Sequence, residues 1–169
     1  MLRCALTLWM TWCVVLLWSP AAFSQPYPSR PITLVVPYAA GSGVDILARI
    51  LMAKLGQRLG QPIIVEAKPG AGSAIGTDFV AKSVPNGHTL MLTTNVLPVL
   101  PISGPAKLPP EITAKLNSEI AGTLNDVREP LLALGLVAEH STPDALTTLV
   151  NVDVARWKEL IASARITVE

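Results

Sequence analysis

Two glycine-rich segments contain the residues of this chain whose types and spacing could do chemistry. They are Ala39-Ala40-Gly41-Ser42-Gly43 and Pro69-Gly70-Ala71-Gly72-Ser73. Each follows an apolar, strand-like run and precedes a helix-like run, so each predicts a turn that opens a helix. Helix N-termini present unpaired backbone N–H groups, and two of them at one sheet edge could hold a small anion. Because this chemistry needs no base, nucleophile or metal, the pattern favours binding over catalysis.

Individual residues in and near these turns suggest how a ligand would be held. Gly41 and Gly43 can adopt positive φ and let a ligand approach the backbone. Asp45 is expected to cap the helix, because a bare carboxylate would repel a bound carboxylate. Asn95 could donate its amide to a ligand at the strand ends, or equally cap a loop. The candidate ligand-binding set is Ala39, Ala40, Gly41, Ser42, Gly43, Asp45, Pro69, Gly70, Ala71, Gly72, Ser73 and Asn95. Taken alone, each turn also fits an ordinary strand-to-helix connection.

The elements that must position these turns alternate between strand and helix. Apolar runs predict strands at residues 32–36, 62–65 and 89–93, and helices at 46–59 and 74–82. This order implies parallel strands joined by right-handed crossovers, which is half of a doubly wound, periplasmic-binding-protein-like α/β domain. The residues expected to face inward from the two helices are Ile46, Leu47, Ile50, Leu51, Leu55, Ile75, Phe79 and Val80.

The pattern changes after the third strand. Residues 96–110 form a proline-rich junction without a hydrophobic period, and residues 111–169 read as a helical segment packing on the α/β segment of residues 25–95. One predicted helix carries a stripe of Ile112, Leu116, Ile120 and Leu124, and a short one ends at Gly135. A last helix, starting at Thr142-Pro143, is expected to bury Leu146, Val150, Trp157 and Ile161.

The first 24 residues have the features of a secretory signal peptide cleaved after about Ser24, with an uncleaved membrane anchor as the rival interpretation. Cys4 and Cys13 are the only cysteines, so the mature chain would have no thiol chemistry. The net charge of +1 falls to zero without Arg3, which disfavours a nucleic-acid partner.

The main alternative is a small Rossmann-type nucleotide-binding enzyme, because Gly70, Gly72 and Gly76 resemble a dinucleotide fingerprint. Two features count against it. Residues 66–69 separate the strand from the glycines, and no acidic residue follows about 20 positions on, where the third strand ends in Thr93-Thr94-Asn95. The two histidines, His88 and His140, have no metal-ligand spacing. We therefore expect neither catalysis nor a cofactor or metal.

Several segments together resemble the Bug/TctC family, the periplasmic solute-binding proteins of tripartite tricarboxylate transporters. They are residues 27–37, 41–49, 68–72 and 85–90, followed in order by 108–117, 135–136, 142–143 and Trp157. The resemblance implies a two-lobed clamshell in the periplasm, with a small carboxylate held between the lobes and delivered to membrane subunits of the transporter. It assigns the two glycine-rich turns to the ligand carboxylate, largely through backbone groups and water.

The chain also departs from this family's pattern. Ala40 stands where proline or glycine is usual, Ser42 and Ser73 where glycine is common, and His88 where tyrosine is common. A serine would be strained if φ is positive there. Family members have on the order of 300 residues, enough for two domains, so we expect an internal deletion of most of the second lobe, or else a natural short linker at 95–110. A single lobe is expected to bind weakly and to expose an apolar sheet edge.

Overall fold

The computed structural model describes residues 26–94, 101–133, 136–137 and 139–163. The predicted signal peptide, Asn95 and Gly135 lie outside these ranges. No helix in the described part of the chain is long and apolar enough to cross a bilayer.

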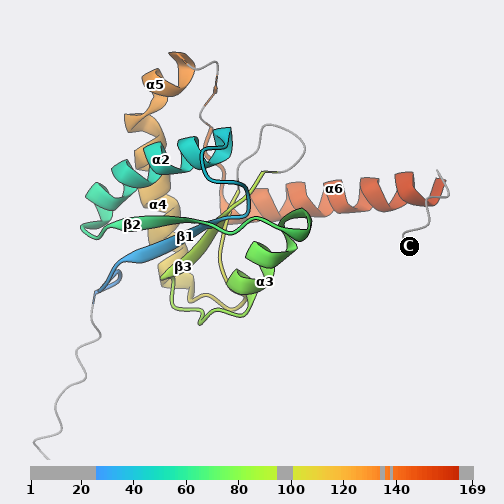
Figure 1. The fold of residues 1–169 in the computed structure, drawn as a ribbon, viewed down its shortest axis with the longest axis horizontal. Helices are drawn as coiled ribbons and strands as arrows, with labels where there is room; N and C mark the ends of the chain where they lie inside the picture. Colours follow the sequence, from blue (N-terminus) through green and yellow to red (C-terminus); the bar gives the residue numbers. More distant parts are fainter. Residues whose placement is uncertain (1–25, 95–100, 134–135, 138, 164–169) are drawn as a thin grey trace, which may run out of the picture.

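A four-stranded sheet forms the centre of the fold, in the order β2-β1-β3-β4 (Figure 1). The strands are β1 (Ile32–Val36), β2 (Ile63–Ala67), β3 (Thr89–Leu92) and β4 (Ile102–Ser103). β1 runs parallel to both β2 and β3, which confirms the predicted α/β fold class. β4 pairs antiparallel with β3 at Met91 and Leu92. β4 lies within the proline-rich junction, for which the sequence predicts no strand or helix period, and it covers part of the sheet edge expected to be exposed.

Helices cover both faces of this sheet. α2 (Gly43–Leu59) and α4 (Pro110–Asp126) lie on one face, and the short helices η1 (Ala71–Ser73) and α3 (Ala74–Ala81) follow β2 towards the other (Figure 1). The main core lies between β1, β3, α2 and α4, and it also includes residues of α5 (Arg128–Ala133). A smaller cluster of Val35, Val80 and Met91 fills the α3 side.

The ends of α2 follow from its capping residues. The Ser42 side chain accepts a hydrogen bond from the Asp45 N–H, so the helix begins earlier than the apolar period predicts. Gly60 ends it in the left-handed conformation, with φ at 69°. Arg58, near this end, pairs with Glu119 and Asp126 of α4 at 3.0 and 3.1 Å, which fixes α4 against α2.

The predicted stripe of α4 packs as expected. Leu116 is buried, and Ile112, Ile120 and Leu124 contact the main core while remaining partly exposed. Several other inward assignments were wrong: Ile46 and Ile50 of α2 and Ile75 and Phe79 of α3 are exposed. The cause in α3 is that a two-turn helix covers little of its face of the sheet, so only Val80 and Gly76 are buried. Lys68 Nζ lies 4.3 Å from the Phe79 ring centroid.

The last helix, α6 (Pro143–Ser163), begins as predicted, because the Ala145 N–H donates to Thr142 Oγ1 at 3.2 Å. Its predicted burial was wrong. No residue of α6 is buried, with Leu146 only half-buried and Val150, Trp157 and Ile161 exposed. The helix projects from the body of the protein (Figure 1). The apolar stripe of α6 marks a side of the helix that another element could cover, but no other described part of the chain covers it.

Candidate functional site

Both glycine-rich turns lie at the same edge of the sheet. Val36 at the end of β1 is in register with Ala67 at the end of β2, and the two strands are parallel. The first turn follows β1 directly and the second follows β2 (Figure 1). The end of β3, followed by Thr93 and Thr94, reaches the same edge because β3 is also parallel to β1. The backbone places these three segments together, as the strand order predicts.

Asp45 holds the first turn in shape. Its side chain is 2% exposed and accepts hydrogen bonds from the Gly41 N–H at 2.9 Å and from Arg49 Nε and Nη2 at 3.0 and 3.1 Å. These bonds, from Arg49 first and Gly41 second, lower the pKa of Asp45 below its ordinary value. Because the carboxylate already has these partners, its role in the structure is to organise the turn.

Replacing Asp45 with asparagine is expected to lower the free energy of unfolding at pH 7. The pKa of Asp45 is lowered by folding, so its ionised form stabilises the fold above its ordinary value of 3.8 and loses that effect as pH falls through the lower folded-state value. The difference between wild type and Asp45→Asn in urea unfolding should therefore shrink in acid.

Asp78→Asn is the matched control for this experiment. Asp78 also pairs with a basic residue four positions on, Lys82 at 2.8 Å, but both side chains are exposed. Exposed pairs of this kind contribute about 0–1 kcal/mol. An equal effect of the two substitutions at pH 7 would show that the buried contacts of Asp45 do not hold the turn.

The second turn has an unusual backbone. Gly70 and Gly72 have φ of 128° and 60°, and Ala71 and Ser73 have φ of 46° and 79°. A residue with a Cβ in this region costs about 1–3 kcal/mol, and such strain concentrates at ligand-binding segments. The strain anticipated for the two serines is therefore present at Ser73 and absent at Ser42, whose φ is −64°. Gly41 has positive φ, at 80°, whereas Gly43 lies in α2.

Some backbone N–H groups in the turns are already used and others are available. Ser42 N–H donates to Ala39 O at 3.1 Å, and Ser73 N–H donates to Gly70 O at 3.0 Å. Among the described residues, the N–H groups of Ala39, Ala40, Gly70 and Ala71 have no hydrogen-bond partner. Both turns therefore retain donors for an acceptor at this sheet edge.

Tyr38 connects the three segments, and sequence reasoning missed it. Its hydroxyl lies 3.2 Å from Thr93 Oγ1 and accepts from the Thr94 N–H at 3.2 Å. Burial raises its pKa, but hydrogen bonds with Thr93, Thr94 and the Ser73 side chain together lower it below the ordinary value. The tyrosine directly after the proline that ends β1 was the available signal. A hydroxyl at a strand end adds a side-chain polar group to an otherwise main-chain site.

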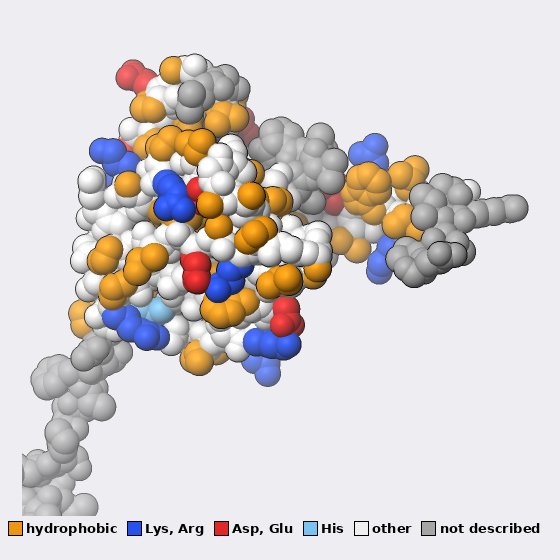
Figure 2. Space-filling view, viewed as in Figure 1, with side chains coloured by type: hydrophobic (Ala, Val, Ile, Leu, Met, Phe, Trp, Pro, Cys, Tyr) orange, Lys and Arg blue, Asp and Glu red, His pale blue; other side chains and the backbone are white. Residues whose placement is uncertain are grey.

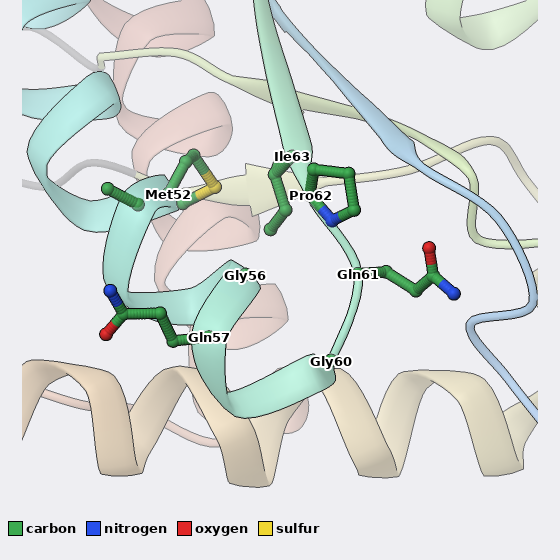
Figure 3. Close-up of a pocket in the computed structure, with 8 residues that line it drawn as sticks. Met52, Gly56, Gln57, Gly60, Gln61, Pro62 and Ile63 are labelled. Atoms are coloured by element: carbon green, nitrogen blue, oxygen red, sulfur yellow. The ribbon is translucent and has the colours of Figure 1, made fainter.

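A hollow of about 440 Å³ lies elsewhere, between the end of α2 and the start of β2 (Figure 3). It is lined by Met52, Ala53, Gly56, Gln57, Gly60, Gln61, Pro62 and Ile63, and the Gln61 side chain points away from α2 (Figure 3). The hollow lies at the amino ends of the strands, opposite the glycine-rich turns. No basic residue lines it, and the C-terminus of α2 presents carbonyl dipoles that disfavour an anion.

The third glycine of the fingerprint-like pattern has a packing role. A Cβ on Gly76 would lie 3.0 Å from Pro37 Cβ and 3.1 Å from Lys68 O, so glycine lets α3 approach the chain beyond β1 and β2. η1 separates β2 from α3, whereas a dinucleotide fingerprint opens its helix directly after the strand. Among the described residues there is no group of three His, Cys, Asp or Glu that could hold a metal ion.

A mixed α/β sheet, parallel in β1, β2 and β3 and antiparallel in β4, resembles half of a periplasmic-binding-protein fold. Residues 47–104 match the model of a family described as "Tripartite tricarboxylate transporter family receptor". Protein BugT of Bordetella pertussis is 45% identical over 76 residues, which is 45% of this chain and 23% of BugT. A UPF0065 protein from the tcbD-tcbE intergenic region of Pseudomonas sp. is 44% identical over 43% of this chain and 22% of its own length. The resemblance to the Bug/TctC family is thus confirmed for this part of the chain, which spans less than a quarter of these relatives.

This chain is also similar to several solved structures. Periplasmic binding protein BugD is 45% identical over 39% of this chain and 22% of its own, with a TM-score of 0.38. A structure described as R. palustris Rpa4515 with adipate has a TM-score of 0.73 at 15% identity and covers 83% of this chain and 99% of its own. MatC from Rhodopseudomonas palustris, described with bound malate, is 42% identical over 39% of this chain and 22% of its own, with a TM-score of 0.38. The Rpa4515 match concerns the fold alone.

Proposed function

We propose that this chain is a solute-binding protein of the tripartite tricarboxylate transporter type that binds a small carboxylate at the carboxyl edge of its sheet. The observation that carries the proposal is the meeting of two glycine-rich turns at one edge, with unpartnered N–H groups in both. Asp45, the carboxylate next to the first turn, already accepts hydrogen bonds from Arg49 and Gly41, so it does not use these donors or the Tyr38 hydroxyl. The site thus suits an acceptor that brings its own negative charge.

The affinity in this proposal is low. The proposal includes the expected deletion of most of the second lobe, which would leave the ligand covered from one side only and each contact to it screened by water. A clamshell gains affinity by closing around its ligand. We expect binding in the millimolar range, which corresponds to about 4 kcal/mol. In the cell, the chain would act in the periplasm and deliver its ligand to the membrane subunits of the transporter.

Saturation-transfer NMR with malate, adipate and citrate, against NAD and ATP, tests this function. We expect transfer to the carboxylates and none to the nucleotides, because no feature of the turns reads a base or a ribose. Transfer to NAD or ATP alone would overturn the proposal in favour of the nucleotide-binding alternative.

The substitution Gly72→Ala tests whether the ligand binds at the second glycine-rich turn. A Cβ on Gly72 would enter open space above the second turn, so we expect carboxylate transfer to fall at least about threefold, a loss of roughly 0.7 kcal/mol. Gly60→Ala is the matched control, because Gly60 also has positive φ and open space around its Cβ but lies at the opposite edge. Equal responses of the two variants would contradict binding at the glycine-rich turns.

A further inference from the structure

We propose that α6 pairs with the α6 of a second copy of this chain, as a parallel two-stranded coiled coil. The starting observation is that this helix of 21 residues contributes no buried residue, although it carries exposed large apolar side chains along its length. They are Leu149, Val150, Val152, Val154, Trp157, Leu160 and Ile161. Figure 2 shows hydrophobic side chains on this projecting segment, with lysine or arginine side chains beside them.

The spacing of four of these residues is that of a coiled-coil seam. Val150, Val154, Trp157 and Ile161 follow one another at intervals of four, three and four residues, as the d, a, d and a positions of a heptad do. Thr147 takes the preceding a position. All three a positions therefore hold β-branched residues, which favour two-stranded assemblies. At about 1.5 Å per residue the helix is roughly 30 Å long, enough for three heptads.

The charged residues that flank the seam favour a parallel arrangement of the two α6 helices. With Val154 at a, Asp153 occupies g and Lys158 occupies e. In a parallel pair the g residue of one helix faces the e residue five positions on in the other, so Asp153 of each copy faces Lys158 of its partner, twice by symmetry. An antiparallel pair would instead set Asp153 opposite Leu160 and Lys158 opposite Asn151, without an ion pair.

A membrane surface suits this helix less well. Amphipathic helices that lie on membranes are rich in Lys and Arg on their polar face. The polar residues of α6 include three acidic residues, Asp144, Asp153 and Glu159, against two basic ones, Arg156 and Lys158. The net charge of the whole chain is only +1, so long-range repulsion does not oppose self-association.

Sedimentation equilibrium of the purified full chain tests the pairing. Because the seam is short, we expect a monomer–dimer equilibrium with a Kd of about 10–100 µM. Val154→Glu should raise that Kd at least about tenfold, because it sets two carboxylates against each other within the seam. A chain that stays monomeric up to several hundred micromolar, or that binds anionic vesicles as a monomer, would overturn the proposal.

Val152→Glu is the matched control. Val152 is 59% exposed and Val154 is 46% exposed on the same helix, but Val152 points to the outer f position. We expect it to change the Kd less than about twofold. Neither substitution touches a buried residue, and circular dichroism should show unchanged helicity. Equal effects of the two variants would mean that association does not use the seam.

Charge reversal tests the parallel arrangement. Lys158→Asp alone sets two carboxylates against each other at each end of the pair and should weaken the dimer about three- to tenfold. Combining it with Asp153→Lys restores opposite charges across the parallel pair and should recover most of that loss. A double variant that dimerises no better than Lys158→Asp would overturn the parallel coiled coil.

Discussion

Leu34→Ala is expected to lower the free energy of unfolding by about 3 kcal/mol. Leu34 lies in the middle of β1, between β2 and β3 in register with Val65 and Leu90, and its side chain is 0% exposed. Truncating a buried leucine loses its transfer free energy and leaves a cavity, at about 2–5 kcal/mol in total. That is a large share of the roughly 5–15 kcal/mol by which domains are stable. Urea unfolding followed by circular dichroism measures the loss.

Ile64→Ala provides the comparison for this experiment. Ile64 lies in the neighbouring strand β2 but is 56% exposed, so its truncation should cost less than about 1 kcal/mol. If both substitutions destabilise the protein equally, the side of the sheet that faces α2 and α4 is not the main core.

Gly70→Ala is expected to abolish measurable ligand binding and to destabilise the protein by about 2 kcal/mol. Gly70 has φ of 128° and ψ of 153°, a region that is essentially restricted to glycine, and forcing another residue into it costs about 1–3 kcal/mol. The new Cβ would also lie 2.5 Å from Ile75 Cδ1, so the side chain that follows the turn must move. Thermal unfolding and carboxylate titration by NMR together measure the two effects.

Gly72→Ala separates strain from steric blocking of the ligand. Gly72 has φ of 60° and open space around its Cβ, so its substitution should cost about 1 kcal/mol, less than that of Gly70. We expect Gly70→Ala to have the larger effect on stability and both variants to weaken binding. A Gly70→Ala protein as stable as wild type would mean that the second turn can adopt another backbone without cost.

The order of strands and helices could be predicted because short local sequence patterns indicate each element. Short apolar runs, β-branched in β1 and β2, predicted β1, β2 and β3, and Gly60 and Thr142 marked a helix end and a helix start at their own positions. β4 could not be predicted in this way. Two residues of a proline-rich stretch cannot show a hydrophobic period. Ile102 and Ser103 form a strand only because they pair with the free edge of β3.

Helix faces were predicted less well, because an apolar stripe does not say whether a partner exists. Leu116 of α4 is buried in the main core. Phe79 of α3 is exposed beside Lys68, and Trp157 of α6 is exposed on a projecting helix. Burial is a property of the tertiary arrangement, and each of these residues has the same helical spacing in sequence.

The placement of the two turns in the candidate site could be predicted from the sequence, but the part played by the Tyr38 side chain could not. Glycine spacing after two strands placed both turns at a common edge, since parallel strands must end together. The link through Tyr38 depends on Thr93 and Ser73, which are 55 and 35 positions away in the chain, and no local pattern encodes such distant hydrogen bonds. The binding role of the candidate residues stays a prediction.

The placement of α4 and α5 on the main core has a consequence for how the protein forms. Every buried residue of the described chain precedes residue 132. Because a polypeptide emerges from the ribosome amino end first, the information needed to build the body is complete before the last helix has been synthesised.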